Sequence, residues 1–282
     1  MQCILFAILQ ILSMMLLAFL YFIDFLGIIN IYGIYHSISN HLDKIIGFNL
    51  HIHSTPPTDY DAVPVVRKTL STGRVLIVCN HPTLLDSYAI IRWGLAHGLQ
   101  HRIVFIAANW IKYLPIPPPF RNKFITIQRD YTVDKDFLTQ FSASLPSDAI
   151  VVIFPEGTTY DADALSKSID YRAKEKLPLF SHTVYPRHKG VDLLLQNNTW
   201  SQVIDMTLHY PERAQNPFMG SEGHHLTHNI YPRICHLYTE DITHITLHTE
   251  KTAKEWLLDR WKLKNKFESA LYVSVVYPPL TV

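Results

Sequence analysis

Residues 75–86 read VLIVCNHPTLLD, a short apolar run rich in β-branched residues that is followed at once by a polar block. The run at 75–79 is typical of a buried strand. Residues 87–99 then carry apolar side chains at roughly helical spacing, so the polar block occupies a strand-to-helix turn. Open α/β sheets place their active sites just beyond the carboxyl ends of strands. The stretch therefore predicts an α/β fold with functional residues in this turn.

A second stretch repeats the arrangement. Residues 149–154 (AIVVIF) form another buried-strand run, and Pro-Glu-Gly-Thr follows directly at 155–158. Gly157 permits a positive φ, and the amide groups of such a turn can form an anion-binding concavity. The alternative is a plain Pro-Gly loop with a solvated Glu156.

The remaining pattern alternates strands with helices. Strands are expected at 103–107, 202–210 and 234–238, and helices at 133–144 and 252–271. The sequence contains no repeat and no low-complexity tract. It therefore predicts a mixed, largely parallel sheet flanked by helices.

Composition excludes several classes of protein. Charged residues make up 17% of the chain, against about 25% in ordinary soluble domains. The 25 basic and 24 acidic residues leave almost no net charge, so nothing favours nucleic acid as a partner. The three cysteines are widely spaced and form neither a disulfide framework nor a zinc motif.

The N-terminal segment is apolar. Cys3 to Ile23 contains no charged residue over 21 positions, Asp24 ends the run, and a second apolar stretch covers 25–35. Spanning a bilayer core takes about 20 apolar residues. A cleaved signal peptide would need a basic start, a shorter core and a small-residue cleavage site, which this segment lacks. We expect a membrane-anchor helix or helical pair in residues 1–50, joined by a Pro-, Ser- and Thr-rich linker at 54–64 to a catalytic domain within 51–282.

The charges around this run predict its orientation. No Lys or Arg precedes the run, and the first ones to follow it include Lys44, Arg67, Lys68 and Arg74. If the run spans, the positive-inside bias places the catalytic domain on the cytoplasmic face of the membrane. Two helices that fold back into one leaflet would give the same sidedness.

His81 and Asp86 are the candidate catalytic residues of the first turn. Pro82 disfavours helical geometry for His81. If Thr83 caps the helix, Asp86 is its third residue and its side chain points back toward the helix start. A carboxylate that accepts from one ring nitrogen leaves the other as a general base. In the alternative reading, 83–86 is only a capping box and His81 is incidental.

Asn80-His81-(four residues)-Asp86 and Phe154-Pro155-Glu156-Gly157-Thr158, about 70 residues apart, together resemble the glycerolipid acyltransferase family. This family includes the 1-acylglycerol-3-phosphate acyltransferases, and its motifs read NHxxxxD and FPEGT. Residues 124–129 (FITIQR) match its second motif. Residues 185–190 (YPRHKG) and 204–211 (IDMTLHYP) are similar to the eukaryotic-type branch, which includes lysocardiolipin acyltransferases.

The resemblance implies a role for each matched residue. His81 would be the general base and Asp86 its orienting partner. The implied substrate-binding residues are Arg129 for the lysophospholipid phosphate, Glu156, Gly157 and Thr158 for the shape of the acceptor site, and Arg187 for a second anion contact. Two positions depart from the family: Thr159 stands where many members have Arg, and Gln128 where many have Asp.

The reaction implied is transfer of a fatty acyl group from acyl-CoA, or from an acyl-carrier protein, to the free hydroxyl of a lysophospholipid. The foremost acceptor is 1-acylglycerol-3-phosphate, which would give phosphatidic acid at the membrane. Direct transfer needs no serine nucleophile, and no G-x-S-x-G elbow is present. No metal and no cofactor beyond the co-substrate acyl-CoA is implied.

The sequence is compatible with two other functions. The same residues could serve a thioesterase or a metal-assisted hydrolase, with the group His224, His225 and His228 recruited as ligands. A solvated loop is the simpler reading of that group, because Gly220, Gly223 and Pro232 surround it. The chain could also be a non-catalytic membrane protein in which 83–86 merely caps a helix.

Overall fold

The structure is a computed structural model that describes residues 40, 43–44, 47–53, 70–113, 122–221, 232–248 and 250–276, with side chains as far as 271. The apolar run Cys3–Ile23, in which the sequence predicts an anchor, lies outside these residues, as do His224, His225 and His228. In the described part of the chain, no helix is both long and apolar enough to cross a membrane.

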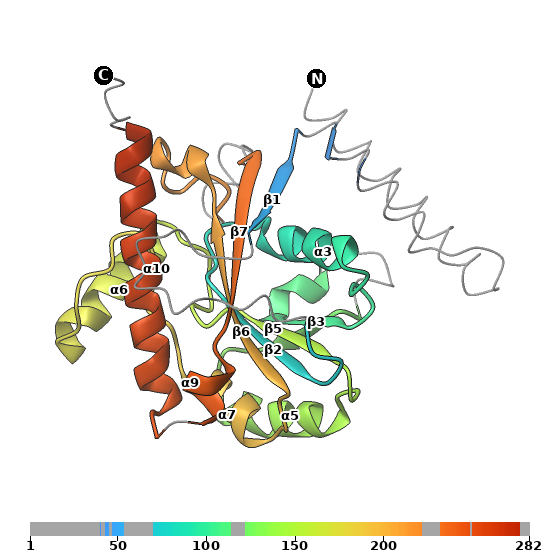
Figure 1. Ribbon diagram of the computed structural model, residues 1–282. Coiled ribbons are helices and arrows are strands. Elements are labelled where there is room, and N and C mark those ends of the chain that lie inside the picture. The colour runs from blue at the N-terminus through green and yellow to red at the C-terminus, as the bar shows by residue number, and fades with distance from the viewer. Residues whose placement is uncertain are drawn as a thin grey trace.

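A seven-stranded mixed sheet forms the centre of the domain (Figure 1). Its strands are β1 (Asn49–His53), β2 (Val75–Cys79), β3 (Ile103–Ala108), β4 (Phe124–Ile127), β5 (Ile150–Ile153), β6 (Gln202–His209) and β7 (Ile234–Asp241), in the order β1-β7-β6-β2-β5-β3-β4. The five strands from β6 to β4 run parallel to their neighbours. β7 is antiparallel to β6, and β1 is parallel to β7. The predicted α/β class with a mixed, largely parallel sheet is confirmed.

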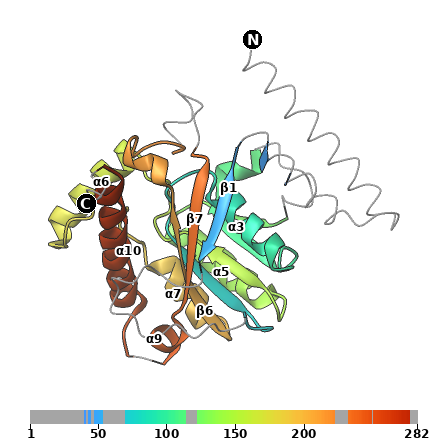
Figure 2. The same ribbon diagram turned by 45° about the horizontal axis from the view of Figure 1, so that its top comes forward.

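Helices cover both faces of the sheet. They are α3 (Asp86–Ala96), α5 (Tyr131–Ser144), α6 (Ala162–Glu175), α7 (Lys189–Gln196), α9 (Thr243–Leu247) and α10 (Ala253–Val276), with 3₁₀ turns η1 (Asn109–Tyr113) and η2 (Pro211–Ala214). Figures 1 and 2 show α3 on one side of the sheet and α10 on the other. Aspartate side chains begin two of the helices, since Asp130 accepts from the Thr132 amide and Asp161 from the Ala164 amide.

The central strand β2 explains why these runs are apolar throughout. All five of its residues are buried. Leu76 and Val78 belong to the core beneath α5, α7 and α10, whereas Val75, Ile77 and Cys79 belong to the core beneath α3. Successive side chains point to opposite faces of a strand, so a sheet covered on both faces requires a continuous apolar run.

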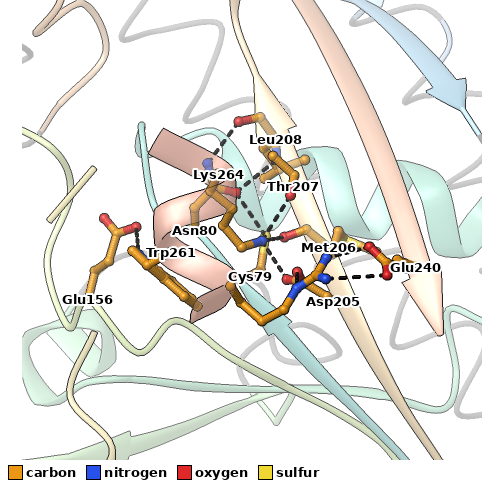
Figure 3. A network of polar contacts seen from close by, with 11 residues as sticks. Cys79, Asn80, Glu156, Asp205, Met206, Thr207, Leu208, Glu240, Trp261 and Lys264 are labelled. Atoms are coloured by element: carbon orange, nitrogen blue, oxygen red, sulfur yellow. Dashed lines mark hydrogen bonds and ion pairs between the residues drawn. The ribbon is translucent and has the colours of Figure 1, made fainter. Parts of the chain in front are cut away.

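A buried polar network fixes α10 on β6 and β7 (Figure 3). Arg260 forms ion pairs with Asp205 at 2.6 Å and with Glu240. Lys264, only 1% exposed, donates to the Met206 carbonyl at 2.6 Å and lies 2.5 Å from Asp205. Buried charges are tolerated only where partners satisfy them, so the network specifies the position of α10 more than it adds stability.

Candidate active site

The two polar turns meet because their strands are neighbours. β2 and β5 run parallel, with Val78 opposite Ile153, so the residues that follow each strand emerge at the same edge of the sheet. The Tyr160 amide donates to the His81 carbonyl at 3.0 Å. The His81 ring stacks on the Phe154 ring with centroids 4.2 Å apart. The structure thus brings the first and second turns into one site.

His81 and Asp86 form the expected pair. His81 Nδ1 lies 2.7 Å from Asp86 Oδ2, and the Asp86 side chain is fully buried. The helix begins later than predicted, however, because α3 starts at Asp86 with Leu85 as its N-cap. Thr83 Oγ1 accepts from the Leu85 amide and donates to Asp86 Oδ1, which closes a separate turn before the helix.

This pairing determines what the imidazole can do. A carboxylate at Nδ1 holds the proton on that nitrogen and leaves the lone pair of Nε2 available. The His81 side chain is 19% exposed and lines the cavity described below. Asp86 is sealed from solvent behind it. The arrangement suits a general base that takes a proton from a bound hydroxyl or water.

The turn after β5 carries Gly157 in the left-handed region, with φ of 70°. The Gly157 amide donates to the Phe154 carbonyl at 3.0 Å, and the Arg187 amide donates to the Pro155 carbonyl at 2.8 Å. A Cβ atom at Gly157 would lie 3.8 Å from three atoms of the Arg187 side chain. The predicted residues Gly157 and Arg187 are therefore packed together.

Glu156 is turned toward the interior. Its side chain is 1% exposed, and Oε1 accepts from the indole N–H of Trp261 on α10 at 2.9 Å (Figure 3). Burial raises the pKa of Glu156 to about 7, partly opposed by the Trp261 hydrogen bond and by His81. The carboxyl group thus joins the turn to α10, next to the candidate base.

A cavity of about 610 Å³ opens at this edge of the sheet. Every predicted site residue except Asp86 lines it: His81, Arg129, Glu156, Gly157, Thr158 and Arg187. Its apolar wall comes from β3, η1, β4 and β5 and includes Phe105, Ile106, Trp110, Ile111, Phe124, Ile127 and Phe154. Lys167 and Lys189 add further positive charge. The cavity therefore combines an apolar wall, a cluster of cations and a positioned imidazole.

Arg129 has an unusual backbone. It follows β4 directly and adopts φ of 66°, a left-handed conformation that is uncommon for residues other than glycine. The residue is exposed and lines the cavity. Such conformations are unfavourable and cluster at functional sites.

Sequence reasoning assigned no role to Tyr210 and Trp261. Tyr210 follows β6 and donates to Asp86 Oδ1 at 2.8 Å, and Trp261 holds Glu156. Tyr210 lies in the segment 204–211 that resembles the eukaryotic-type branch, but only the fold shows what Tyr210 and Trp261 contact. Within the described residues, His, Cys, Asp and Glu form no group of three that could hold a metal.

The sequence of this chain is similar to those of known acyltransferases. A family model described as "Acyltransferase" matches residues 60–191, which include every predicted site residue. The chain is 27% identical over 213 residues to a probable 1-acyl-sn-glycerol-3-phosphate acyltransferase 5 of Arabidopsis thaliana, covering 73% of this chain and 55% of that protein. It is 24% identical over 219 residues to lysocardiolipin acyltransferase 1 of Danio rerio, covering 72% and 53%.

A third relative is the 2-acyl-1-lysophosphatidylinositol acyltransferase of Saccharomyces cerevisiae, 28% identical over 243 residues, with 69% and 60% covered. The chain thus spans little more than half the length of these relatives. The crystal structure of the acyltransferase PlsC from Thermotoga maritima matches with a TM-score of 0.42 and 13% identity, covering 90% of this chain and 97% of that one.

Proposed function

We propose that the chain is an acyltransferase that moves a fatty acyl group from a thioester to the free hydroxyl of a lysophospholipid. Its motifs and the family model that matches residues 60–191 support this proposal. The observation that carries this proposal is the His81–Asp86 pair, 2.7 Å apart, at the wall of an apolar cavity with cations around it. The base can activate a hydroxyl, the apolar wall can hold an acyl chain, and the positive charge can bind a phosphate.

The reaction needs one proton to be moved twice. His81 Nε2 takes the proton of the acceptor hydroxyl as its oxygen attacks the thioester carbonyl carbon. The new C–O bond forms, the C–S bond breaks, and the leaving sulfur takes the proton from the imidazolium, which yields the free thiol. General-base assistance of this kind is typically worth about 10²–10⁴-fold. Asp86 stabilises the imidazolium and keeps the ring oriented.

The acceptor is expected to carry a phosphate. Arg129 and Arg187 both line the cavity, and a guanidinium presents a planar set of donors that suits phosphate. The names of the three relatives refer to 1-acyl-sn-glycerol-3-phosphate, lysocardiolipin and 2-acyl-1-lysophosphatidylinositol. We take 1-acylglycerol-3-phosphate as the first acceptor to test, with acyl-CoA as donor and an acyl-carrier protein as the second donor.

The test is acyl transfer by membranes that carry the purified chain, with labelled acyl-CoA and a panel of lysolipids. We expect labelled diacyl product, and we expect His81→Ala to reduce its rate by about 10²-fold or more. The panel identifies the headgroup. Asp86→Asn should also reduce the rate, because asparagine favours the wrong ring tautomer.

Two other outcomes would change the assignment. Free fatty acid released without diacyl product would indicate a hydrolase, and sensitivity to a chelator would indicate that a metal assists it. A folded chain that turns over neither acyl-CoA nor acyl-carrier protein would favour a non-catalytic membrane protein. His101→Ala serves as the control, because His101 is exposed and does not line the cavity.

A further inference from the structure

We propose that Tyr210 is a positioning residue of this site, which holds the Asp86 carboxylate and through it the ring of His81. The inference rests on the proposed function. Tyr210 directly follows β6 and is 1% exposed. Its hydroxyl donates to Asp86 Oδ1 at 2.8 Å.

Four donors surround the buried carboxylate of Asp86. Oδ2 lies 2.7 Å from His81 Nδ1 and accepts from the Thr83 amide at 3.0 Å. Oδ1 accepts from Thr83 Oγ1 at 3.1 Å and from the Tyr210 hydroxyl. His81 and Thr83 belong to the same turn as Asp86 and move with it. Of these four donors, only Tyr210 comes from a distant segment of the chain, so it fixes the carboxylate relative to the sheet.

The end of strand β6 holds the turn that contains His81 at a second point. Asn80, which precedes His81, exchanges two hydrogen bonds with the backbone of Leu208, donating at 2.9 Å and accepting at 2.8 Å (Figure 3). The turn is thus fastened to the end of β6 on both sides of His81, by Asn80 before it and by Asp86 after it. A rotation of the turn would break contacts at both points.

The hydroxyl of Tyr210 acts as a donor here. Burial raises its pKa well above the ordinary value of 10, and the charge of Asp86 raises it further. The hydroxyl therefore stays protonated at neutral pH and can donate to the carboxylate. A hydrogen bond to a charged group is about twice as strong as one between neutral groups.

The geometry predicts which kinetic constant depends on Tyr210. Tyr210 does not line the cavity, so substrate does not touch it. Tyr210→Phe keeps the ring and removes only the donor, which leaves Thr83 as the remaining donor to Asp86 Oδ1. The carboxylate gains freedom, and the imidazole is less often aligned with the acceptor hydroxyl. We expect kcat to fall about ten- to a hundredfold while KM stays within about twofold.

The experiment compares the wild-type chain, Tyr210→Phe, Asp86→Asn and the double variant in the acyl-transfer assay. If Tyr210 acts through Asp86, Tyr210→Phe should cause no further loss of kcat in the Asp86→Asn background. Tyr88→Phe is the matched control, because the Tyr88 hydroxyl also donates to a carboxylate, that of Asp43, at 2.6 Å. The control should keep the wild-type kcat.

The same four proteins provide a test that does not depend on activity. Their free energies of unfolding give the coupling between Tyr210 and Asp86, which should be clearly different from zero. A wild-type chain without transfer activity but with this coupling would refute the proposed function and keep the Tyr210–Asp86 contact. The inference itself is overturned by zero coupling, by an unchanged kcat in Tyr210→Phe, or by an effect on KM alone.

Discussion

Glu156 carries a carboxyl group in a place where burial opposes its charge. Its pKa rises from 4.5 to about 7, so the folded chain holds this proton more tightly than the unfolded chain does. The contribution of this residue to stability is therefore fully present below pH 4.5 and is lost as the pH rises toward 7. The Trp261 hydrogen bond is compatible with either protonation state, because it uses Glu156 as an acceptor.

Glu156→Gln should remove this pH dependence. Glutamine keeps an oxygen acceptor for Trp261 and cannot ionise, so we expect it to raise the unfolding temperature more at pH 8 than at pH 5, relative to wild type. Thermal unfolding across this range measures the difference. Glu255→Gln is the opposite control, because hydrogen bonds with Thr252 lower the pKa of Glu255 and its stabilising effect is present at pH 8. A constant difference between Glu156→Gln and wild type at all pH values would contradict the argument.

Substitutions of Arg129 and Arg187 test whether these residues bind the phosphate group of the acceptor. Replacing either with Gln should raise KM for lysophosphatidic acid about tenfold and leave kcat nearly unchanged, because a contact made equally in ground and transition states affects KM alone. Steady-state kinetics at constant ionic strength measures this. Lys135→Gln removes an exposed charge outside the cavity and should have no effect. An equal rise in KM for Lys135→Gln would point to general electrostatic attraction instead.

The pairing of His81 with Asp86 was predictable because both lie in one turn, in which Pro82 disfavours helical geometry for His81. The helix itself begins at Asp86 and not after Thr83 as predicted. The contacts of Tyr210 and Trp261 were not predictable, because their partners lie 124 and 105 residues away along the chain. Contacts of that kind depend on strand order and on how α10 lies across the sheet. Local spacing contains neither.

Among the elements, β1 and β7 carry an unusual row of histidines. The His51 and His236 rings stack with centroids 4.9 Å apart, and His53 Nε2 lies 2.9 Å from His236 Nδ1. His209, on β6 opposite His236, pairs with Glu268 at 3.0 Å. Burial, with help from the neighbouring histidines, lowers the pKa of His236 from 6.5 to about 4. The pKa of His53 is also lowered.

This row should make the edge of the sheet sensitive to acid. A histidine with a lowered pKa stabilises the fold above pH 6.5, and the contribution is lost as the pH falls toward 4. We expect the unfolding temperature to fall over this range, and less steeply in His236→Phe, which keeps a stacking ring without a charge. His101→Phe should follow the wild-type curve. Parallel curves for His236→Phe and wild type would show that the lowered pKa of His236 does not cause the loss of stability in acid.

The central strands follow from their apolar runs, since all residues of 75–79 and 150–153 and half of those in 103–108 are buried. Strand β1 could not be predicted in this way, because its sequence NLHIH has only two apolar residues and it lies at the edge of the sheet. Its position comes from pairing with β7, far along the chain. α7 covers only eight residues, too few for a clear helical period.

At the scale of the whole molecule, four segments that are far apart in the sequence serve one site. β2 and β5 bring the two motif turns together, β6 holds Asn80 and Asp86, and α10 holds Glu156. The ion pairs of Arg260 and Lys264 fix α10 on the same strand that positions Asp86. Distortion of α10 should therefore disturb catalysis although the helix supplies no predicted catalytic residue.

An anchor in residues 1–50 would bring this site to substrates that lie in a membrane. The proposed acyl donor and the proposed lysophospholipid both carry long chains that partition into membranes. The run Cys3–Ile23 has the length and composition expected of a membrane anchor. A charged residue near the middle of such a run costs about 2.5–3.5 kcal/mol in membrane insertion. We expect the double substitution Leu12→Arg and Leu16→Arg to reduce the fraction of the chain that resists alkaline extraction from membranes. Transfer to lysolipid in vesicles should fall with it, whereas transfer to a short-chain, water-soluble acceptor should persist because the catalytic residues are unchanged.

Leu12→Ile with Leu16→Ile keeps the run apolar and should behave as wild type. Equal extraction of all three proteins would mean that the run does not anchor the chain.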